Sequence, residues 1–191
     1  MIVLGIDPGL ANTGWGVVEE RRGTVRCHAY GCIQTSAGSD LAARLKHIAD
    51  ELHHIVERYQ PQEAAVEGIY FGVNARSAIP TAHARGAALV ACALCGVEVG
   101  EYTPMQIKQA VVGTGAADKA QVAFMVRTLL GLDHEPKPDH ASDALACAIC
   151  HANLRRTATL TSGAYSHVKG SAYSRFLCLR DVLSRLRRLA C

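Results

Sequence analysis

The N-terminal stretch constrains the fold more than any other part of the sequence. Met1 to Ile6 is almost entirely apolar, and the run ends at an acid, Asp7, which Pro8 and Gly9 follow. A short apolar run that stops at Pro-Gly is typical of a buried strand followed by a tight turn. An ionised carboxylate beside apolar sequence is costly unless a positive group meets it. We therefore expect a central strand that ends at Asp7, with a metal ion, a basic partner or a phosphate-binding loop beside it, or else a solvated turn.

The order of the remaining elements predicts the fold class. Residues 14–20 and 24–35 have strand character, and their short connections predict an antiparallel meander with the first strand. Two further strands, over 64–67 and 97–102, each follow a helix, which is typical of parallel pairing. We therefore expect an α/β fold with a mixed five-stranded sheet, three antiparallel strands plus two parallel ones, and helices on both faces. The helices are predicted over 41–59, 75–94, 104–112, 117–130 and 139–154.

A second acid stands in the same kind of position as Asp7. The apolar run 64–66 ends at Glu67, and neighbouring parallel strands would place Glu67 beside Asp7. The last predicted helix adds His140 and Asp143, which are three positions apart and project from one face near the helix N-terminus. Three carboxylates and one imidazole suit Mg²⁺ or Mn²⁺, and paired ions of this kind hydrolyse phosphodiesters. The pattern predicts a metal-dependent nuclease; taken alone, Asp139 and Asp143 also fit ordinary helix N-terminal acids.

Positive charge is concentrated at the C-terminal end of the chain. Residues 155–191 hold eight Lys or Arg against one acid, although the whole chain carries only +3. Residues 1–154 are therefore net acidic, and their charge does not itself predict binding to nucleic acid. We expect 1–154 to form one domain and 155–191 to be a basic extension. An amphipathic helix over 174–190 would bind DNA, a protein partner or a membrane surface, or pack on the domain as a dispensable extension.

Cysteine spacing and hydropathy argue against several classes of protein. The pairs Cys92–Cys95 and Cys147–Cys150 have the spacing of zinc ligands. Both pairs lie in Ala-rich apolar segments, where we interpret them as small buried side chains of helices. No run reaches the roughly 18 apolar residues that a membrane span needs, and no signal peptide is visible. We therefore expect a cytoplasmic protein without a membrane-spanning segment.

Five segments between about residues 2 and 152 form an ordered set of motifs. They are Leu4-Gly5-Ile6-Asp7-Pro8-Gly9, Ala65-Val66-Glu67, the stretch from Val111 to Val122, Met125-Val126-Arg127, and the stretch from Asp139 to Ala146. The set resembles the RuvC family of Holliday junction resolvases, within the RNase H-like superfamily. The resemblance implies an RNase H-like fold and a homodimeric endonuclease of DNA recombination and repair. Such an enzyme nicks two opposed strands of a four-way junction symmetrically, leaves 5′-phosphate ends and works with the RuvA and RuvB branch-migration complex.

The resemblance also implies roles for particular residues. Asp7, Glu67, His140 and Asp143 fall on the family's four catalytic, metal-binding positions, which implies two Mg²⁺ ions per site, with Mn²⁺ able to substitute. His140 stands where many members carry Asp, and it is either a ligand or a general base. Without the motifs, Lys108 and Lys119 would be interpreted as solvated surface side chains, and Tyr70 and Phe71 as core side chains. The residues implied to contact DNA are Lys108, Lys119, Tyr70, Phe71 and Arg76, the last in a Gly- and Ala-rich helix where family dimers meet.

Other classes of protein share part of this pattern. A RuvX/YqgF-type nuclease, an RNase H-like relative that processes RNA, is the nearest alternative; the Lys108-to-Lys119 segment and the aromatic pair at Tyr70 favour the resolvase. A nucleotide-binding lobe of the actin, Hsp70 or sugar-kinase type also begins with a strand, an acid and glycines. Such a lobe needs a second lobe to enclose ATP, and 191 residues are too few for both. A catalytically silent junction-binding protein would not need four competent metal ligands.

Overall fold

The structure is a computed structural model that describes residues 1–68 and 75–162. Within these residues the elements follow the order βββαβαβααα, as the sequence predicts. The strands are β1 (Ile2–Asp7), β2 (Asn12–Arg21), β3 (Thr24–Gln34), β4 (Glu63–Glu67) and β5 (Glu98–Tyr102). The helices are α1 (Leu41–Tyr59), α2 (Ala75–Leu94), α3 (Pro104–Val112), α4 (Lys119–Leu130) and α5 (Asp139–Ser162).

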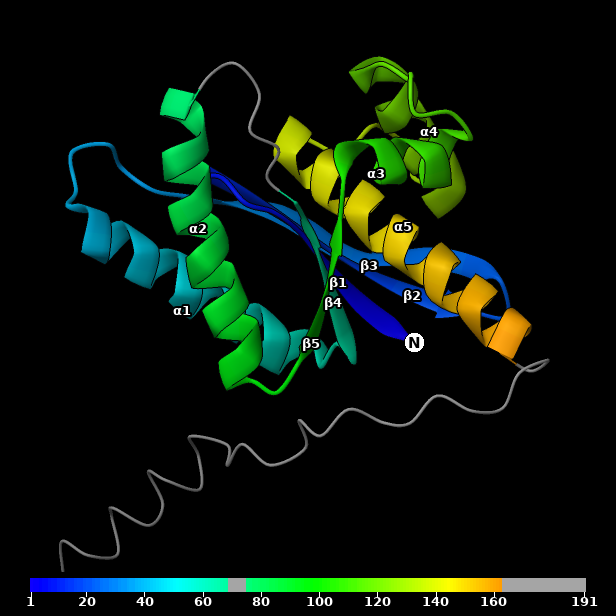
Figure 1. Ribbon diagram of the computed structural model, residues 1–191, viewed down its shortest axis with the longest axis horizontal. Helices are drawn as coiled ribbons and strands as arrows, with labels where there is room; N and C mark the ends of the chain where they lie inside the picture. The colour runs from blue at the N-terminus through cyan, green and yellow to red at the C-terminus, as the bar shows by residue number, and fades with distance from the viewer. Residues whose placement is uncertain (69–74, 163–191) are drawn as a thin grey trace, which may run out of the picture.

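The strands form one mixed sheet in the order β3-β2-β1-β4-β5, with β1 at its centre (Figure 1). β1 pairs antiparallel with β2, and β2 pairs antiparallel with β3, which completes the predicted meander. β4 runs parallel to β1 on one side and to β5 on the other. The predicted sheet of three antiparallel and two parallel strands is therefore confirmed. Because β1 and β4 are parallel neighbours, their carboxyl ends meet at one edge of the sheet.

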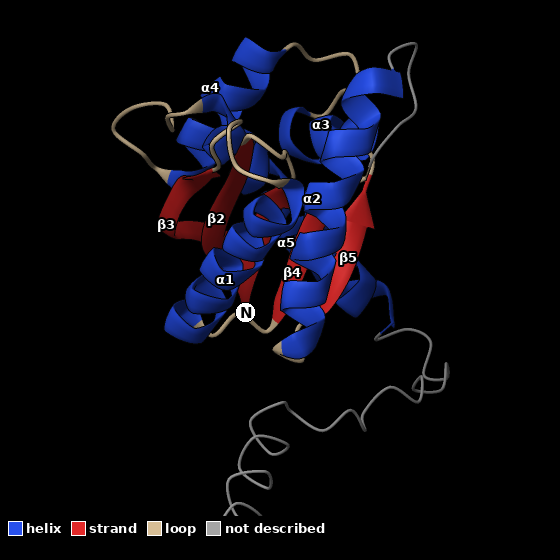
Figure 2. Ribbon diagram, turned by 90° about the vertical axis from the view of Figure 1, so that its left-hand side faces the viewer, coloured by secondary structure: helices blue, strands red, loops and turns tan. Residues whose placement is uncertain are grey.

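Helices cover both faces of the sheet, and the alternation of side chains along β1 explains why both faces are apolar. Leu4 and Ile6 pack in one core cluster with side chains of α1 and α2. Val3 points to the opposite face and packs in a second cluster with α3, α4 and α5. Figure 2 shows α1 and α2 together in front of the strands. The strand is buried on both sides, as its continuous apolar sequence predicts.

Two helix ends differ from the sequence-based expectation. α4 begins at Lys119 rather than near residue 117, because Asp118 and Gln121 form a capping box at that point. α5 continues to Ser162 instead of ending near Leu154, so the expected boundary at residue 154 falls inside a helix. In the part of the chain that the structure describes, no helix has the length and apolarity needed to cross a membrane.

α5 lies unusually close to the sheet because glycines face it. A Cβ added at Gly5 would lie 2.0 Å from the carbonyl oxygen of Ala144, and one added at Gly14 would lie 1.9 Å from the carbonyl oxygen of His140. Real Cβ atoms do not approach backbone oxygens this closely, so any larger residue would push α5 outward. The glycines of β1 and β2 thereby hold the N-terminal part of α5 against the end of β1.

Candidate active site

The strand-end acids meet at the carboxyl edge of the sheet. The parallel register pairs Ile6 of β1 with Val66 of β4, so the next residues, Asp7 and Glu67, follow on neighbouring strands at the same edge. Their charges act on each other, because the Asp7 carboxylate raises the pKa of Glu67. The juxtaposition that the sequence predicts is therefore present.

The N-terminal part of α5 adds two more groups to this edge. His140 Nδ1 lies 2.7 Å from Asp7 Oδ2. Ligand atoms of Asp7, His140 and Asp143 all lie within 4.8 Å of one another, and this is the one such group of three or more among the described residues. Glu67 is outside this tight group but lines the same pocket. Residues separated by more than 130 positions in the sequence are thus brought together in a form that suits a cation.

Burial and repulsion from neighbouring charges raise the pKa values of two carboxyl groups at this site, Asp7 and Glu67. Burial raises the pKa of the Asp7 carboxyl, and the nearby Asp143 charge adds to the effect, although the hydrogen bond from His140 acts in the opposite direction. Burial, together with the charges of Asp7 and Asp143, raises the pKa of Glu67 to about 7. A divalent cation would relieve this repulsion, and carboxylate oxygens with one imidazole fit Mg²⁺ or Mn²⁺. The donor set therefore fits the metal that the sequence predicts.

Two lysines lie at the same pocket as the acids. Lys119, the first residue of α4, places its Nζ 3.0 Å from Asp143 Oδ2, and this contact raises the pKa of Lys119. Lys108 of α3 lines the pocket, and its charge partly counters the rise in the pKa of Glu67. The pocket has a volume of about 370 Å³. Lys119 is largely exposed, so both an acidic centre and an accessible cation are available to a phosphate group.

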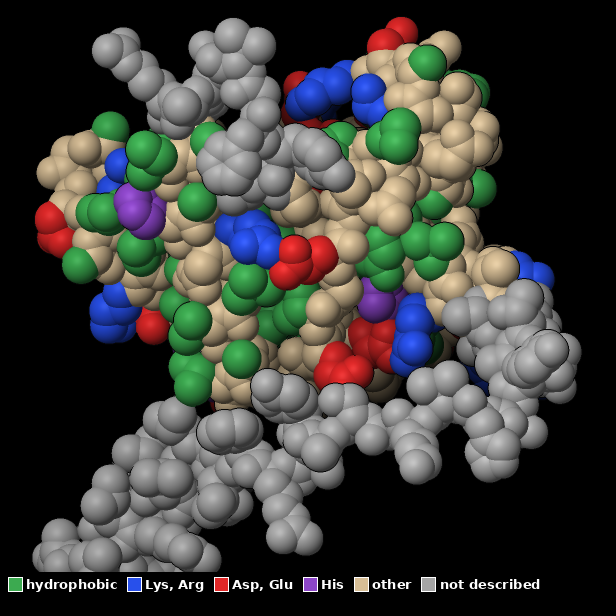
Figure 3. Space-filling model, viewed as in Figure 1, with side chains coloured by type: hydrophobic (Ala, Val, Ile, Leu, Met, Phe, Trp, Pro, Cys, Tyr) green, Lys and Arg blue, Asp and Glu red, His purple; other side chains and the backbone are tan. Residues whose placement is uncertain are grey.

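The face of the molecule drawn in Figure 3 is not uniformly basic. On the face drawn in Figure 3, Lys and Arg side chains occur in small groups, several of them beside acids. This agrees with the net acidic charge of residues 1–154. Attraction of a polyanion by this part of the molecule therefore depends on local lysines rather than on overall charge.

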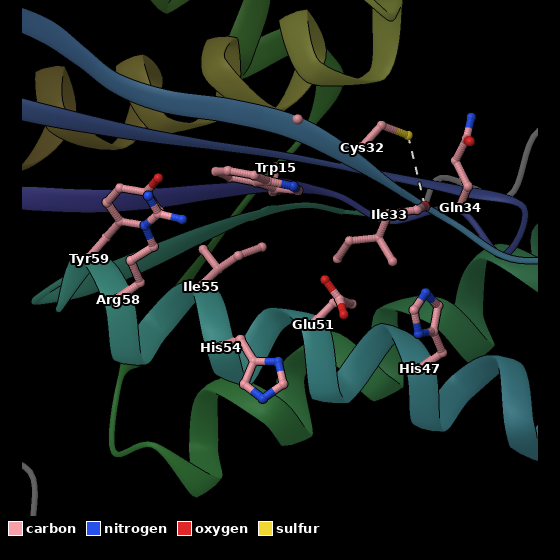
Figure 4. A pocket seen from close by; sticks show the side chains of 11 residues that line it. Trp15, Cys32, Ile33, Gln34, His47, Glu51, His54, Ile55, Arg58 and Tyr59 are labelled. Atoms are coloured by element: carbon pink, nitrogen blue, oxygen red, sulfur yellow. Dashed lines mark hydrogen bonds between the residues drawn. The ribbon is translucent and has the colours of Figure 1, made fainter.

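A second hollow lies between α1 and the β2–β3 part of the sheet. It has a volume of about 600 Å³, and Figure 4 shows Trp15 lying along the strands, with His47, Glu51 and His54 on α1. The guanidinium carbon of Arg58 lies 5.4 Å from the ring centre of the adjacent tyrosine. The hollow is larger than the acidic pocket, but among the described residues it holds no group of three metal-ligating side chains. Its size alone assigns it no chemistry.

The remaining predicted site residues have different outcomes. Tyr70 and Phe71 lie outside the described residues, and so does the side chain of Arg76, whose backbone belongs to α2. Asp139, the neighbour of His140, stays largely exposed and pairs with Lys137 at 3.7 Å. It is not part of the cluster of Asp7, His140 and Asp143.

Three of the four paired cysteines are buried side chains of helices, as the sequence predicts, whereas Cys95 differs. Cys147 and Cys150 are fully buried in α5, and Cys92 is fully buried in α2. Cys95 is partly buried just after α2 and contacts His53. No cysteine belongs to the metal-binding group found in the described part of the chain.

The groups that hold the site in place were not predicted from the sequence. Gly5 and Gly14 set the distance of α5 from the sheet, and the only signal for them was the presence of glycine inside predicted strands. His151, further along α5, contacts Tyr102 and Glu63 in a partly buried polar chain. Nothing in the local sequence distinguishes that histidine from a surface residue.

Comparison with known proteins places this arrangement in a family. The family model described as "Crossover junction endodeoxyribonuclease RuvC" matches residues 3–151. The chain belongs to the RuvC family. RuvC of Moorella thermoacetica is 48% identical over 154 residues, covering 81% of this chain and 92% of that protein. RuvC of Desulforamulus reducens is 50% identical over 157 residues, covering 82% and 96%.

Solved RuvC structures agree with the fold as well. The structure of Thermus thermophilus RuvC has a TM-score of 0.78 at 40% identity and covers 83% of this chain and 98% of that one. T. thermophilus RuvC in complex with Holliday junction substrate has a TM-score of 0.79 at 39% identity and covers 83% and 97%. The RNase H-like fold and the resemblance to RuvC are thus confirmed, and membership of the RuvC family sets aside the RuvX/YqgF and actin-type alternatives.

Proposed function

We propose that this chain is a divalent-metal-dependent endonuclease that resolves four-way DNA junctions by cutting two opposed strands. The observation that carries the proposal is the convergence of Asp7, His140 and Asp143, whose ligand atoms lie within 4.8 Å of one another. Membership of the RuvC family, and likeness to a RuvC bound to Holliday junction substrate, support the substrate class. The activity serves DNA recombination and repair.

The donor set supports Mg²⁺ as the cofactor, with Mn²⁺ as a substitute and two ions per active site. Asp7, Glu67, Asp143 and His140 are the residues that would hold them. Bound ions would supply an activated water and charge stabilisation at the leaving 3′-oxygen, so that the product carries a 5′-phosphate. Without such ions, buried carboxylates would repel the phosphodiester as well as one another.

The residues of the site have distinct tasks in this proposal. The Asp7 carboxylate accepts a hydrogen bond from Nδ1–H of His140, which leaves Nε2 of the neutral ring with its lone pair. His140 is therefore oriented to act either as a ligand or as a base. Lys108 and Lys119 are suited to the phosphates on either side of the cut, because ammonium groups at the pocket offset the charge that the acids present.

A cleavage assay with an isosteric variant tests the proposal. Asp7→Asn should cut a synthetic four-way junction at least about 100-fold more slowly in Mg²⁺, while it binds the junction normally without metal. Asp139→Asn is the matched control, because Asp139 is an exposed acid beside the site that pairs only with surface Lys137 in the described structure. Equal activity of Asp7→Asn and wild type, or cleavage in EDTA, would contradict the metal mechanism. Equal cutting of linear duplex would contradict selectivity for junctions.

Symmetric cutting requires two sites, and we propose that the chain acts as a homodimer. In α2, the exposed apolar side chains of Ile79, Val90 and Leu94 are suited to contact with a second copy. Sedimentation of the protein across a range of concentrations tests this directly. The RuvA and RuvB complex stays a prediction from the family resemblance, and a cytoplasmic location stays a prediction from hydropathy and the N-terminal sequence.

A further inference from the structure

A partly buried polar chain crosses the interface between α5 and the sheet, away from the acidic cluster. His151 of α5 is almost inaccessible to solvent. Its Nδ1 lies 2.9 Å from Tyr102 Oη, and its Nε2 lies 2.5 Å from Glu63 Oε2. Arg155 binds the other carboxylate oxygen of Glu63. The proposed mechanism uses none of these four groups.

The chemistry of the partners fixes the direction of the hydrogen bonds. The Glu63 carboxylate only accepts, so Nε2 of His151 donates to it, and Nδ1 of the neutral ring accepts from the Tyr102 hydroxyl. Burial acts against ionisation of Glu63, but the hydrogen bonds from Arg155 and His151 prevail and lower the pKa of Glu63. Burial raises the pKa of Tyr102 to about 12. Tyr102, His151, Glu63 and Arg155 therefore form one continuous hydrogen-bonded chain.

Glu63 and His151 each belong to an element that also carries a residue of the metal-binding cluster. Glu63 begins β4, and Glu67 ends it. Tyr102 stands opposite Glu67 in the register of β4 and β5, and its carbonyl accepts from the N–H of Gly68 at 2.8 Å. His151 lies on α5 eight positions after Asp143, about 12 Å along the helix axis. The hydrogen bond between His151 and Glu63 thus connects the helix that carries His140 and Asp143 to the strand that carries Glu67.

Apolar packing alone gives α5 few directional contacts with the strands. Nearer the acids the helix presents small side chains, such as Ala144 and Ala148, to Gly5, and apolar contact has little directional preference. Hydrogen bonds at both ring nitrogens of His151 do have direction and length. Gly100 makes room for them, because a Cβ there would lie 2.8 Å from His151 Nδ1. The backbone of β5 therefore leaves space for this histidine.

We propose that His151 is a positioning residue for the metal-binding cluster. Its bonds to Tyr102 and Glu63 hold α5 at one position along β4, and this sets the distance of His140 and Asp143 from Glu67. The proposal rests on the proposed function only for the cleavage step; the effect on metal binding stands on its own. Loss of these hydrogen bonds lets α5 shift along the sheet. The acids then no longer reach a shared ion, although all of them remain in the protein.

The test measures metal binding and cleavage separately. Mn²⁺ binding to the DNA-free protein is followed by calorimetry, and the metal concentration for half-maximal junction cleavage is measured in parallel. His151→Leu should raise both the Kd for Mn²⁺ and the metal concentration for half-maximal cleavage about tenfold, as expected when a supporting hydrogen bond is lost. Metal-free junction affinity should stay within about twofold of wild type. His151→Gln, which keeps an N–H donor for Glu63, should recover most of the binding.

A packing variant separates positioning from general destabilisation. Ile149→Val removes a methyl group from a fully buried side chain of α5 without touching the polar chain, so it should lower Tm without changing the metal requirement. Unchanged Mn²⁺ binding by His151→Leu below its Tm, or an equal change in Ile149→Val, would overturn the proposal.

A milder variant covers the case in which His151→Leu does not fold. Tyr102→Phe deletes only the hydroxyl, and it should weaken Mn²⁺ binding about threefold; no change would overturn the proposal. A wild-type protein that fails to cut junctions, with variants that still show weakened Mn²⁺ binding, would refute the proposed function while supporting the positioning role.

Discussion

At the scale of single residues, Glu67 carries the clearest electrostatic cost of the site. Burial and the charges of Asp7 and Asp143 raise its pKa to about 7. In the metal-free protein the folded state therefore holds a proton on Glu67 that the unfolded chain releases near the ordinary glutamate pKa of 4.5. Ionising Glu67 is unfavourable in the folded state. The resulting loss in the free energy of unfolding develops as pH rises from the pKa of Glu67 in the unfolded chain towards its pKa in the folded protein.

The stability of the metal-free protein should therefore depend on pH through Glu67. Between about pH 5 and pH 8 in EDTA, the free energy of unfolding should fall by on the order of 2 kcal/mol more in wild type than in Glu67→Gln. Urea unfolding at several pH values measures the difference. Glu135→Gln, a change at an exposed loop acid, should behave as wild type. Identical pH profiles for wild type and Glu67→Gln would contradict the buried acidic cluster.

Lys108 offers a separate test of contact with the DNA backbone. Lys108→Met should weaken metal-free junction binding and reduce the slope of log affinity against log salt by about 0.9, as expected when one phosphate contact is lost. Filter binding at several salt concentrations measures this slope. Lys46→Met is the control, because Lys46 lies on α1 and pairs with Asp50 away from the pocket. An unchanged slope for Lys108→Met would show that this lysine does not contact a phosphate.

At the scale of elements, the approach of α5 to β1 decides whether the acids meet. Gly5→Ala places a Cβ 2.0 Å from the carbonyl oxygen of Ala144, and a backbone atom cannot move aside without moving its helix. We expect a loss of about 1–3 kcal/mol in the free energy of unfolding, measured by urea unfolding. Junction cleavage should fall at least about tenfold, because Asp143 moves with α5.

A glycine in open surroundings provides the control for this substitution. At Gly38, an added Cβ would meet only Ser36 Oγ, at 3.7 Å, so Gly38→Ala should leave stability and cleavage close to wild type. Full activity in Gly5→Ala would mean that α5 accommodates the methyl group without displacing the acids, contrary to the role of the glycines argued here.

The elements themselves were largely predictable from sequence, for local physical reasons. Amphipathic spacing with Asp40 as the N-cap defines α1, and the Thr103-Pro104 start defines α3. The end of α5 was not predictable: the helix has almost no amphipathic pattern, and the polar residues beyond Leu154 resemble a linker. Close contacts such as Gly14 with His140 were also hidden, because they join residues that are far apart in the sequence.

At the scale of the whole molecule, topology explains why the site could be predicted before its geometry was known. Acids at the ends of two parallel neighbouring strands must share an edge, so Asp7 and Glu67 needed only the strand order. The support from His151 could not be predicted, because it depends on how far α5 lies along the sheet. The sequence pattern of strand-end acids therefore predicts the function, whereas the distances between the site residues depend on tertiary contacts.

The described structure also changes where the basic extension should be removed. A chain ending at residue 154 would lose the bond from Arg155 to Glu63, together with the last turns of α5, whereas one ending at Ser162 keeps both. If the extension is accessory, the 1–162 chain should match the full chain in Tm within about 2 °C and in junction cleavage within about threefold. The 1–154 chain should be less stable, because Glu63 loses a charged partner.

Thermal unfolding and cleavage assays of the three chains decide between these outcomes. Loss of junction affinity in 1–162, with Tm unchanged, would show that residues 163–191 bind DNA. The salt dependence of affinity identifies the cause: removing a basic DNA-binding segment lowers the slope against log salt, whereas removing a segment that contacts only protein does not. Equal stability of 1–154 and 1–162 would instead show that Arg155 adds nothing to the anchoring of Glu63, and the partly buried polar chain would then depend on His151 and Tyr102 alone.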